Sequence, residues 1–211
     1  MILFLALIIG IYYFSRLTVR EIFFFLRKIF KSDRPVLIFV TIILLPGTII
    51  HELSHFLVAL ALMLPVRSIS IIPTYEAKEI RLGEVKFEKR DFIRGGLVGV
   101  APFFLGIILL LFIFYFRIFP GEGIIFNAIM SYLIFSVSSN MFSSSQDLKD
   151  IIFVVPVLLL VFTVFYVFDI KLDMDFINAI MNEASYYLIY VFAINAGLFL
   201  SLKILNNIVK K

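Results

Sequence analysis

The chain has 211 residues, of which 62% are hydrophobic and only 16% are charged, and its mean hydropathy is +1.08. A soluble domain is about half apolar and about a quarter charged, so a soluble fold of this length cannot bury such a surplus of apolar side chains. The composition therefore excludes an ordinary soluble enzyme, a disordered protein and a nucleic-acid-binding domain. With no Cys in the chain, disulfides, thiolate metal sites and a cysteine nucleophile are also excluded.

Apolar segments follow one another along the chain, and a transmembrane helix needs about 20 such residues. We therefore predict an all-α polytopic membrane protein that forms one integral membrane domain over residues 1–211. It has about six transmembrane helices and a small β-hairpin between the second and the third. The predicted helices cover about residues 1–15, 35–64, 95–117, 124–144, 151–169 and 184–205. The first segment lacks a basic start and a cleavage site, so we interpret it as a retained anchor rather than a cleaved signal peptide.

Two polar segments lie between the predicted helices. Residues 17–30 interleave basic side chains with Phe, which is typical of an interfacial stretch or of a continuation of the first helix. Residues 66–90 alternate apolar and polar side chains in two runs, and this pattern predicts the β-hairpin.

Basic loops favour the cytoplasmic side of a membrane. The last four helices satisfy this rule if the hairpin and the C-terminus are cytoplasmic and the acidic loop around Asp173 and Asp175 is outside. The basic loop after the first helix then conflicts with the rule, because one helix separates it from the hairpin.

The only two histidines of the chain, His51 and His55, are four residues apart, and Glu52 follows the first. Residues i and i+4 project from one face of a helix, where two imidazoles can bind one Zn²⁺ and the glutamate can act as a general base. The motif lies near the middle of an apolar segment, where ionisable residues are costly and usually functional. We therefore predict a catalytic zinc site with one ion per chain, in which Glu52 activates a zinc-bound water.

A catalytic zinc ion takes three protein ligands, and the third must here be a carboxylate. Asp147 is our prediction, because it follows a stretch of small polar residues at the end of the fourth segment. Asp150 is the alternative. Each could instead be a solvated residue at the start of the next helix.

These residues resemble the site-2 protease family of intramembrane zinc metalloproteases over about residues 35–150. The similarity rests on the segment from His51 to His55 inside an apolar helix, on the segment from Asn140 to Asp147, on the hairpin and on the glycine-rich segment 95–102. The second motif of that family contains two prolines and a glycine that this chain lacks, so the chain resembles a divergent, minimal member. The resemblance implies His51, His55 and Asp147 as zinc ligands and Glu52 as the catalytic residue.

Asn140 is a further candidate, because its amide can donate to the substrate backbone or to the oxyanion. A helix-packing amide is the equal alternative. The expected substrate is a membrane-anchored protein, cleaved in or near its transmembrane segment by a hydrolase in the cell membrane of a prokaryote. A homo-oligomeric state is left open, and no nucleic acid is expected as a partner. A membrane transporter or channel with a divalent-cation site, or an inactive protease-like membrane protein, is the alternative function.

Overall fold

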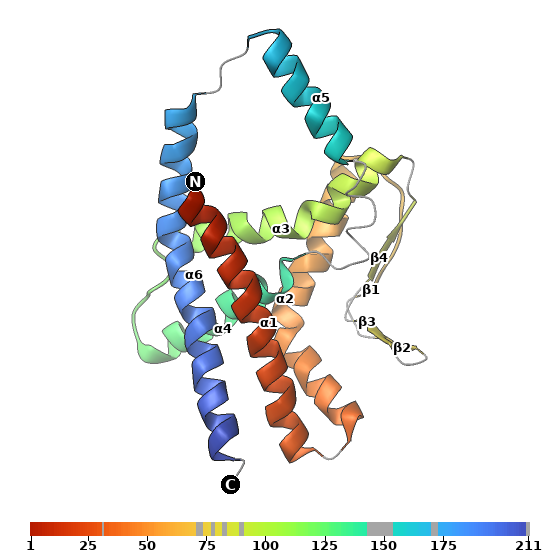
Figure 1. Ribbon diagram of the computed structural model, residues 1–211. Coiled ribbons are helices and arrows are strands. Elements are labelled where there is room, and N and C mark those ends of the chain that lie inside the picture. The colour runs from red at the N-terminus through yellow and green to blue at the C-terminus, as the bar shows by residue number, and fades with distance from the viewer. Residues whose placement is uncertain are drawn as a thin grey trace.

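The computed structural model describes residues 1–30, 32–70, 74–76, 79–81, 84–88, 91–142, 154–169 and 173–209. Six helices and four short strands lie within these ranges (Figure 1). The helices are α1 (Ile2–Ile29), α2 (Asp33–Ala61), α3 (Phe92–Tyr115), α4 (Ile124–Asn140), α5 (Val154–Val167) and α6 (Met174–Ile208). The strands are β1 (Val66–Ser70), β2 (Thr74–Glu76), β3 (Glu79–Arg81) and β4 (Glu84–Phe87).

The chain is mostly helical, and four of its helices are long and apolar enough to cross a membrane. These are α1, α2, α3 and α6, with 28, 29, 24 and 35 residues. Helix α4 is also apolar, but its 17 residues make it shorter than a typical span. The structure thus agrees with an all-α membrane protein and shows four candidate spans rather than the six predicted.

Helix α1 runs without a break through residues 17–29, where the sequence left an interfacial stretch and a continuation as alternatives. The continuation is correct, because apolar and small side chains recur every three or four residues and pack against neighbouring helices, while the basic side chains of the same stretch face outward. The buried residues are Leu7, Ile11, Ser15, Thr18, Ile22 and Leu26.

Helices α1 and α6 lie side by side and run in the same direction (Figure 1). Thr18 Oγ1 donates to the carbonyl of Asn195 at 3.3 Å, and further along both helices Asn206 Nδ2 donates to the carbonyl of Glu21 at 3.0 Å. Because these contacts advance in the same direction along both helices, α1 and α6 form a parallel pair.

Helix α6 begins at Met174, ten residues before the predicted start. The carboxylate of Asp173 accepts hydrogen bonds from the backbone N–H groups of Asp175 and Phe176, both at 3.0 Å. This N-cap satisfies two of the donors that a helix start leaves without a partner. The helix therefore starts at the acidic loop rather than at the first continuous apolar run.

The predicted hairpin is present between α2 and α3. Strands β1 and β4 pair antiparallel with Val66 opposite Phe87, and β2 and β3 pair antiparallel further along the two legs. Arg67 forms a salt bridge with Glu88 at the base. Because β1 and β4 also contact α2, the hairpin is held against the helix that carries both histidines.

Helix α4 is central and contacts α1, α2, α3 and α6. The main apolar cluster joins Ile134 and Val137 of α4 to buried side chains of α1, α3 and α6. In the described part of the chain, α3 is the only element against which α5 packs to any extent. The core therefore forms around α4, and α2 packs its histidine-bearing half against it.

Candidate metal centre

A proline lies in α2 about one turn before the histidines. Pro46 has no backbone N–H to donate and is inside the helix. The N–H of Gly47 donates to Ser136 Oγ at 2.9 Å, and the carbonyl of Leu44 accepts from Ser136 Oγ at 3.2 Å and from Asn140 Nδ2 at 3.4 Å. Neighbouring polar side chains can satisfy backbone groups in lipid in this way. Side chains of α4 therefore bind backbone groups of α2 on both sides of Pro46.

Gly47 also sets how closely the two helices approach. A Cβ atom at this position would lie 2.0 Å from the carbonyl oxygen of Ser136 and 2.6 Å from Asn140 Nδ2. No side chain fits in that space, so only glycine permits this contact between backbones. The close approach brings the end of α4 beside the next turn of α2, where His51 is located.

Both imidazoles are oriented by backbone carbonyls of other helices. His51 Nδ1 lies 2.6 Å from the carbonyl oxygen of Asn140 on α4, and His55 Nδ1 lies 2.8 Å from that of Val98 on α3. A carbonyl oxygen can only accept, so each Nδ1 carries the hydrogen. In the neutral rings, this tautomer places the lone pair on each Nε2. The same outer contact orients histidine ligands in most metal sites.

The two Nε2 atoms face each other at 3.1 Å. Two lone pairs at that distance repel unless a positive charge lies between them. Tetrahedral Zn²⁺ with its nitrogens at 2.0–2.1 Å would hold them about 3.3–3.4 Å apart, close to the distance observed. Two neutral imidazoles with convergent lone pairs therefore fit a zinc ion.

Glu52 and His55 are buried, each with an exposed fraction of 6%. An ionisable side chain buried in a membrane segment is costly and usually functional, so the burial of Glu52 favours a functional role. The structure brings His51, Glu52 and His55 together on one turn of α2, where the sequence predicted them.

Asp147 and Asp150 lie outside the described residues. The described part of the chain contains no group of three or more His, Cys, Asp or Glu residues that could hold a metal. The third ligand therefore stays a prediction, and His51 and His55 are the two predicted ligands whose geometry is visible.

Asn140 contributes to the site through its backbone. Its side-chain Nδ2 donates to the carbonyls of Ser136 at 2.9 Å and of Leu44 at 3.4 Å, so both amide hydrogens have acceptors. This is the arrangement of a helix-packing amide, the alternative that the sequence left open. Its carbonyl, meanwhile, orients His51.

Three contributors to the site were missed by sequence reasoning: the carbonyl of Val98, the hydroxyl of Ser136 and the carbonyl of Asn140. Gly95, Gly96 and Gly99 belong to the glycine-rich segment 95–102, and all three are buried beside Val98 on α3. Glycines around a helix position expose its carbonyl to a neighbour, and this was the one available signal for the Val98 contact.

Comparisons of the chain with protein-family models, with curated proteins and with solved structures find no match.

Proposed function

We propose that this chain is an intramembrane zinc metalloendopeptidase that hydrolyses a peptide bond in or near a transmembrane segment of a membrane-anchored protein. One observation carries the proposal: the Nε2 atoms of His51 and His55 converge at 3.1 Å while both Nδ1 atoms bind carbonyls. The order His-Glu-x-x-His on a helix and the resemblance to the site-2 protease family support it further.

His51, His55 and Asp147 would hold the ion, with Asp150 as the alternative third ligand. Zn²⁺, when bound, polarises a peptide carbonyl and lowers the pKa of a coordinated water to about 7. The carbonyls of Val98 and Asn140 keep both imidazoles in the tautomer and orientation that ligation requires.

Glu52 is the general base in this proposal. Its carboxylate takes a proton from the attacking water and passes that proton to the leaving amine. Its exposed fraction of 6% would strengthen the electrostatic interaction of this carboxylate with a zinc ion bound beside it. We assign Asn140 to the orientation of His51 rather than to the oxyanion, because both of its amide hydrogens already bind carbonyls.

Zinc content of the detergent-purified protein tests the metal site. We expect one zinc per chain in the wild type, loss of zinc in His55→Ala and Asp147→Ala, and retention in Asp150→Ala. Zinc in both aspartate variants would place the third ligand elsewhere. A wild-type protein without zinc would refute the proposal.

Activity is tested with Glu52→Gln, which should keep the metal but not cleave a labelled transmembrane peptide in the same liposomes. Full cleavage by Glu52→Gln would refute the role of the glutamate. Metal flux into proteoliposomes that is lost in His55→Ala, without cleavage by the wild type, would favour the transporter alternative.

A further inference from the structure

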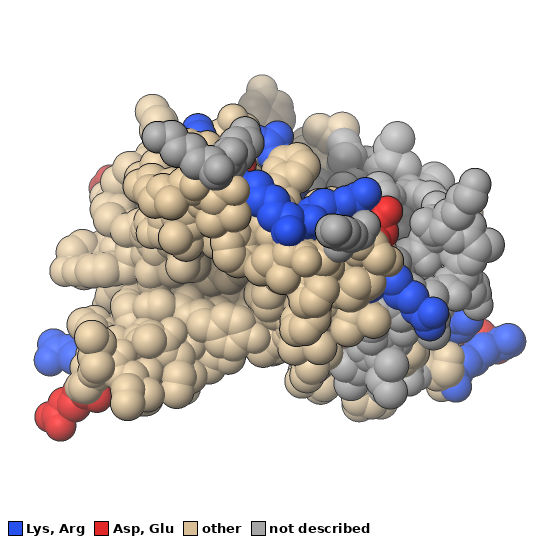
Figure 2. Space-filling view, turned by 90° about the horizontal axis from the view of Figure 1, so that it is seen from below, with Lys and Arg blue, Asp and Glu red and all other residues tan. Residues whose placement is uncertain are grey.

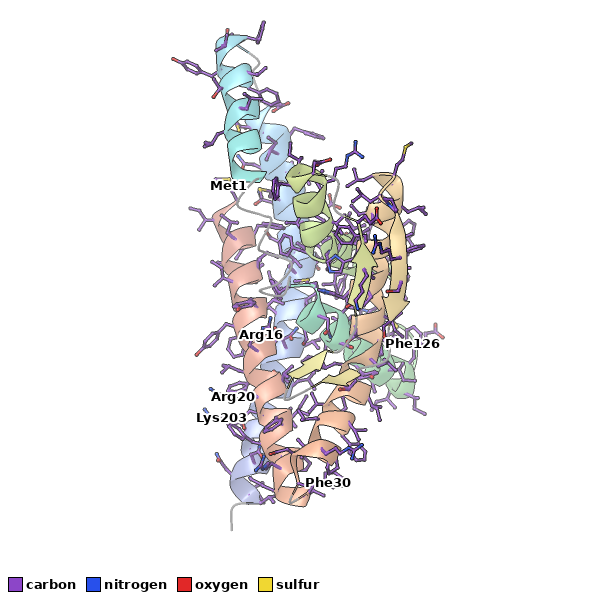
Figure 3. All side chains as sticks on the ribbon, turned by 90° about the vertical axis from the view of Figure 1, so that its right-hand side faces the viewer. Met1, Arg16, Arg20, Phe30, Phe126 and Lys203 are labelled. Atoms are coloured by element: carbon purple, nitrogen blue, oxygen red, sulfur yellow. The ribbon has the colours of Figure 1, made fainter. Side chains whose placement is uncertain are left out.

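Three basic side chains lie on the outer surface of the α1–α6 pair. Arg16 and Arg20 are one turn apart on α1, and Lys203 is on α6, and all three are exposed. The hydrogen bonds from Thr18 to Asn195 and from Asn206 to Glu21 lie on either side of Arg20 on α1 and of Lys203 on α6, which places these two side chains at a similar height along the pair. Figure 3 shows the three labelled side chains along one edge of the molecule.

No carboxylate in the described part of the chain neutralises these three cations. Of the acidic residues nearby, Asp33 forms a salt bridge with Arg27, and Glu21 keeps its negative charge while it accepts a hydrogen bond from Asn206. Viewed from the end where α1 and α6 finish, the surface is largely uncharged, with basic side chains near its centre and at its edges (Figure 2). Exposed apolar side chains of α1 and α6 include Tyr13, Phe24, Leu200 and Ile204. The cluster, defined as Arg16, Arg20 and Lys203, therefore presents a net positive charge beside exposed apolar side chains.

Aromatic rings hold two members of this basic cluster. The Arg16 guanidinium lies over the ring of Tyr12 at 5.5 Å, and the Lys203 ammonium lies over the ring of Phe199 at 5.3 Å. Cation–π contacts of this kind keep the aliphatic part of a basic side chain on apolar surface and its charge at the edge of the hydrocarbon.

The length of α6 gives the depth of the cluster. No charged residue lies between Glu183 and Lys203, and these two are about 20 residues apart. At 1.5 Å per residue this stretch is about 30 Å long, which matches the hydrocarbon thickness of a bilayer. With Glu183 at one surface of the membrane, Lys203 and its neighbour Arg20 lie among the lipid head groups of the other.

We propose that Arg16, Arg20 and Lys203 bind the phosphate group of an anionic phospholipid at the membrane surface. Each cation near an anionic head group should favour that lipid about fivefold over a zwitterionic one. Three cations should together favour it by at least one order of magnitude at low salt, and by less as salt increases.

The absence of Trp from the chain allows a direct test. Tyr12→Trp places a single fluorophore under Arg16 and keeps the cation–π contact. Its quenching is compared in two sets of mixed vesicles of phosphatidylglycerol and phosphatidylcholine, in which only the first or only the second lipid is brominated. Phe126→Trp, on the opposite side of the molecule in Figure 3, is the control reporter.

We expect stronger quenching of the Tyr12→Trp reporter by phosphatidylglycerol, and no preference at the Phe126→Trp reporter. Changing Arg16, Arg20 and Lys203 to Gln together should abolish the preference, while Arg27→Gln, which removes a cation already paired with Asp33, should leave it intact. Circular dichroism confirms that each variant is folded.

Equal quenching of the Tyr12→Trp reporter by both lipids would overturn the proposal, as would a preference that survives the triple substitution. Inorganic phosphate distinguishes a lipid head group from a free anion. If it removes the preference at an ionic strength at which sodium chloride does not, the site binds free phosphate and the lipid proposal is wrong.

Discussion

The substitution Gly47→Ala tests whether the α2–α4 contact creates the metal site. The added methyl would lie 2.0 Å from the Ser136 carbonyl oxygen, where an ordinary contact begins at 3.4 Å. The helices must therefore separate by about 1.4 Å at this point. The His51–Asn140 distance would grow from 2.6 Å to about 4 Å, which is too long for a hydrogen bond.

Two effects follow from that separation. Overpacking combined with the loss of the bonds from α4 should destabilise the protein by about 3 kcal/mol. Loss of the carbonyl that orients His51 should weaken zinc binding by about 10–100-fold, as for other outer contacts of metal ligands. Titration of the purified protein against a competing zinc chelator measures the second effect, and unfolding in sodium dodecyl sulfate measures the first.

Gly197→Ala is the matched control, because a Cβ at Gly197 has no neighbour within 4 Å. It should leave zinc affinity unchanged and stabilise α6 by up to about 1 kcal/mol. Ser136→Ala removes the hydroxyl that binds Gly47 without overpacking, and should show a smaller loss of stability of about 1 kcal/mol. If Gly47→Ala folds and binds zinc within about twofold of the wild type, the helix contact does not orient His51.

Three further predictions concern stability. Asn195→Ala removes the amide that donates to Ser138 Oγ at 2.9 Å, and should lower the free energy of unfolding by about 1–2 kcal/mol in sodium dodecyl sulfate; an unchanged value would contradict this. Arg67→Gln breaks the exposed pair with Glu88 and should cost less than about 1 kcal/mol in the same assay. A chelator should lower the melting temperature of the wild type but not of His55→Ala, because zinc at 100 times its Kd stabilises the folded state by about 3 kcal/mol.

Local sequence patterns predicted the helices and the hairpin of this fold. The residues at which the helices begin and end depended on packing and capping contacts. The apolar segments and the alternating hairpin were recognised because lipid exposure and strand pairing leave periodic signals. The extension of α1 to Ile29 and of α6 back to Met174 was not fixed by apolar content. Packing of Ile22 and Leu26 decided the first, and the Asp173 cap decided the second.

The candidate site likewise combines residues that the sequence predicted with contacts that only the packing of the helices determines. His51, Glu52 and His55 were predicted because their spacing on one helix is itself the signal. The carbonyls of Val98 and Asn140 could not be predicted, since every residue has a carbonyl and only the packing of α3 and α4 against α2 selects these two. Asn140 was chosen for its amide, and it is the backbone of this residue that contacts His51.

The shared direction of α1 and α6 determines how often the chain passes through a bilayer that both helices cross. The segment from the end of α1 to the start of α6 must then traverse the bilayer an odd number of times, so the total is also odd. Five passages are compatible with this arrangement and six are not. The two ends of the chain consequently face opposite compartments.

The basic residues after α1 and the basic end of α6 then share one compartment, and the acidic residues before α6 face the other. The base of the hairpin follows the far end of α2 and lies with the acidic residues (Figure 1). In this arrangement the hairpin base and the C-terminus lie on opposite sides, whereas the basic loops predicted that they share one. A reagent that cannot cross the membrane would meet the hairpin base from one compartment and the last turn of α6 from the other.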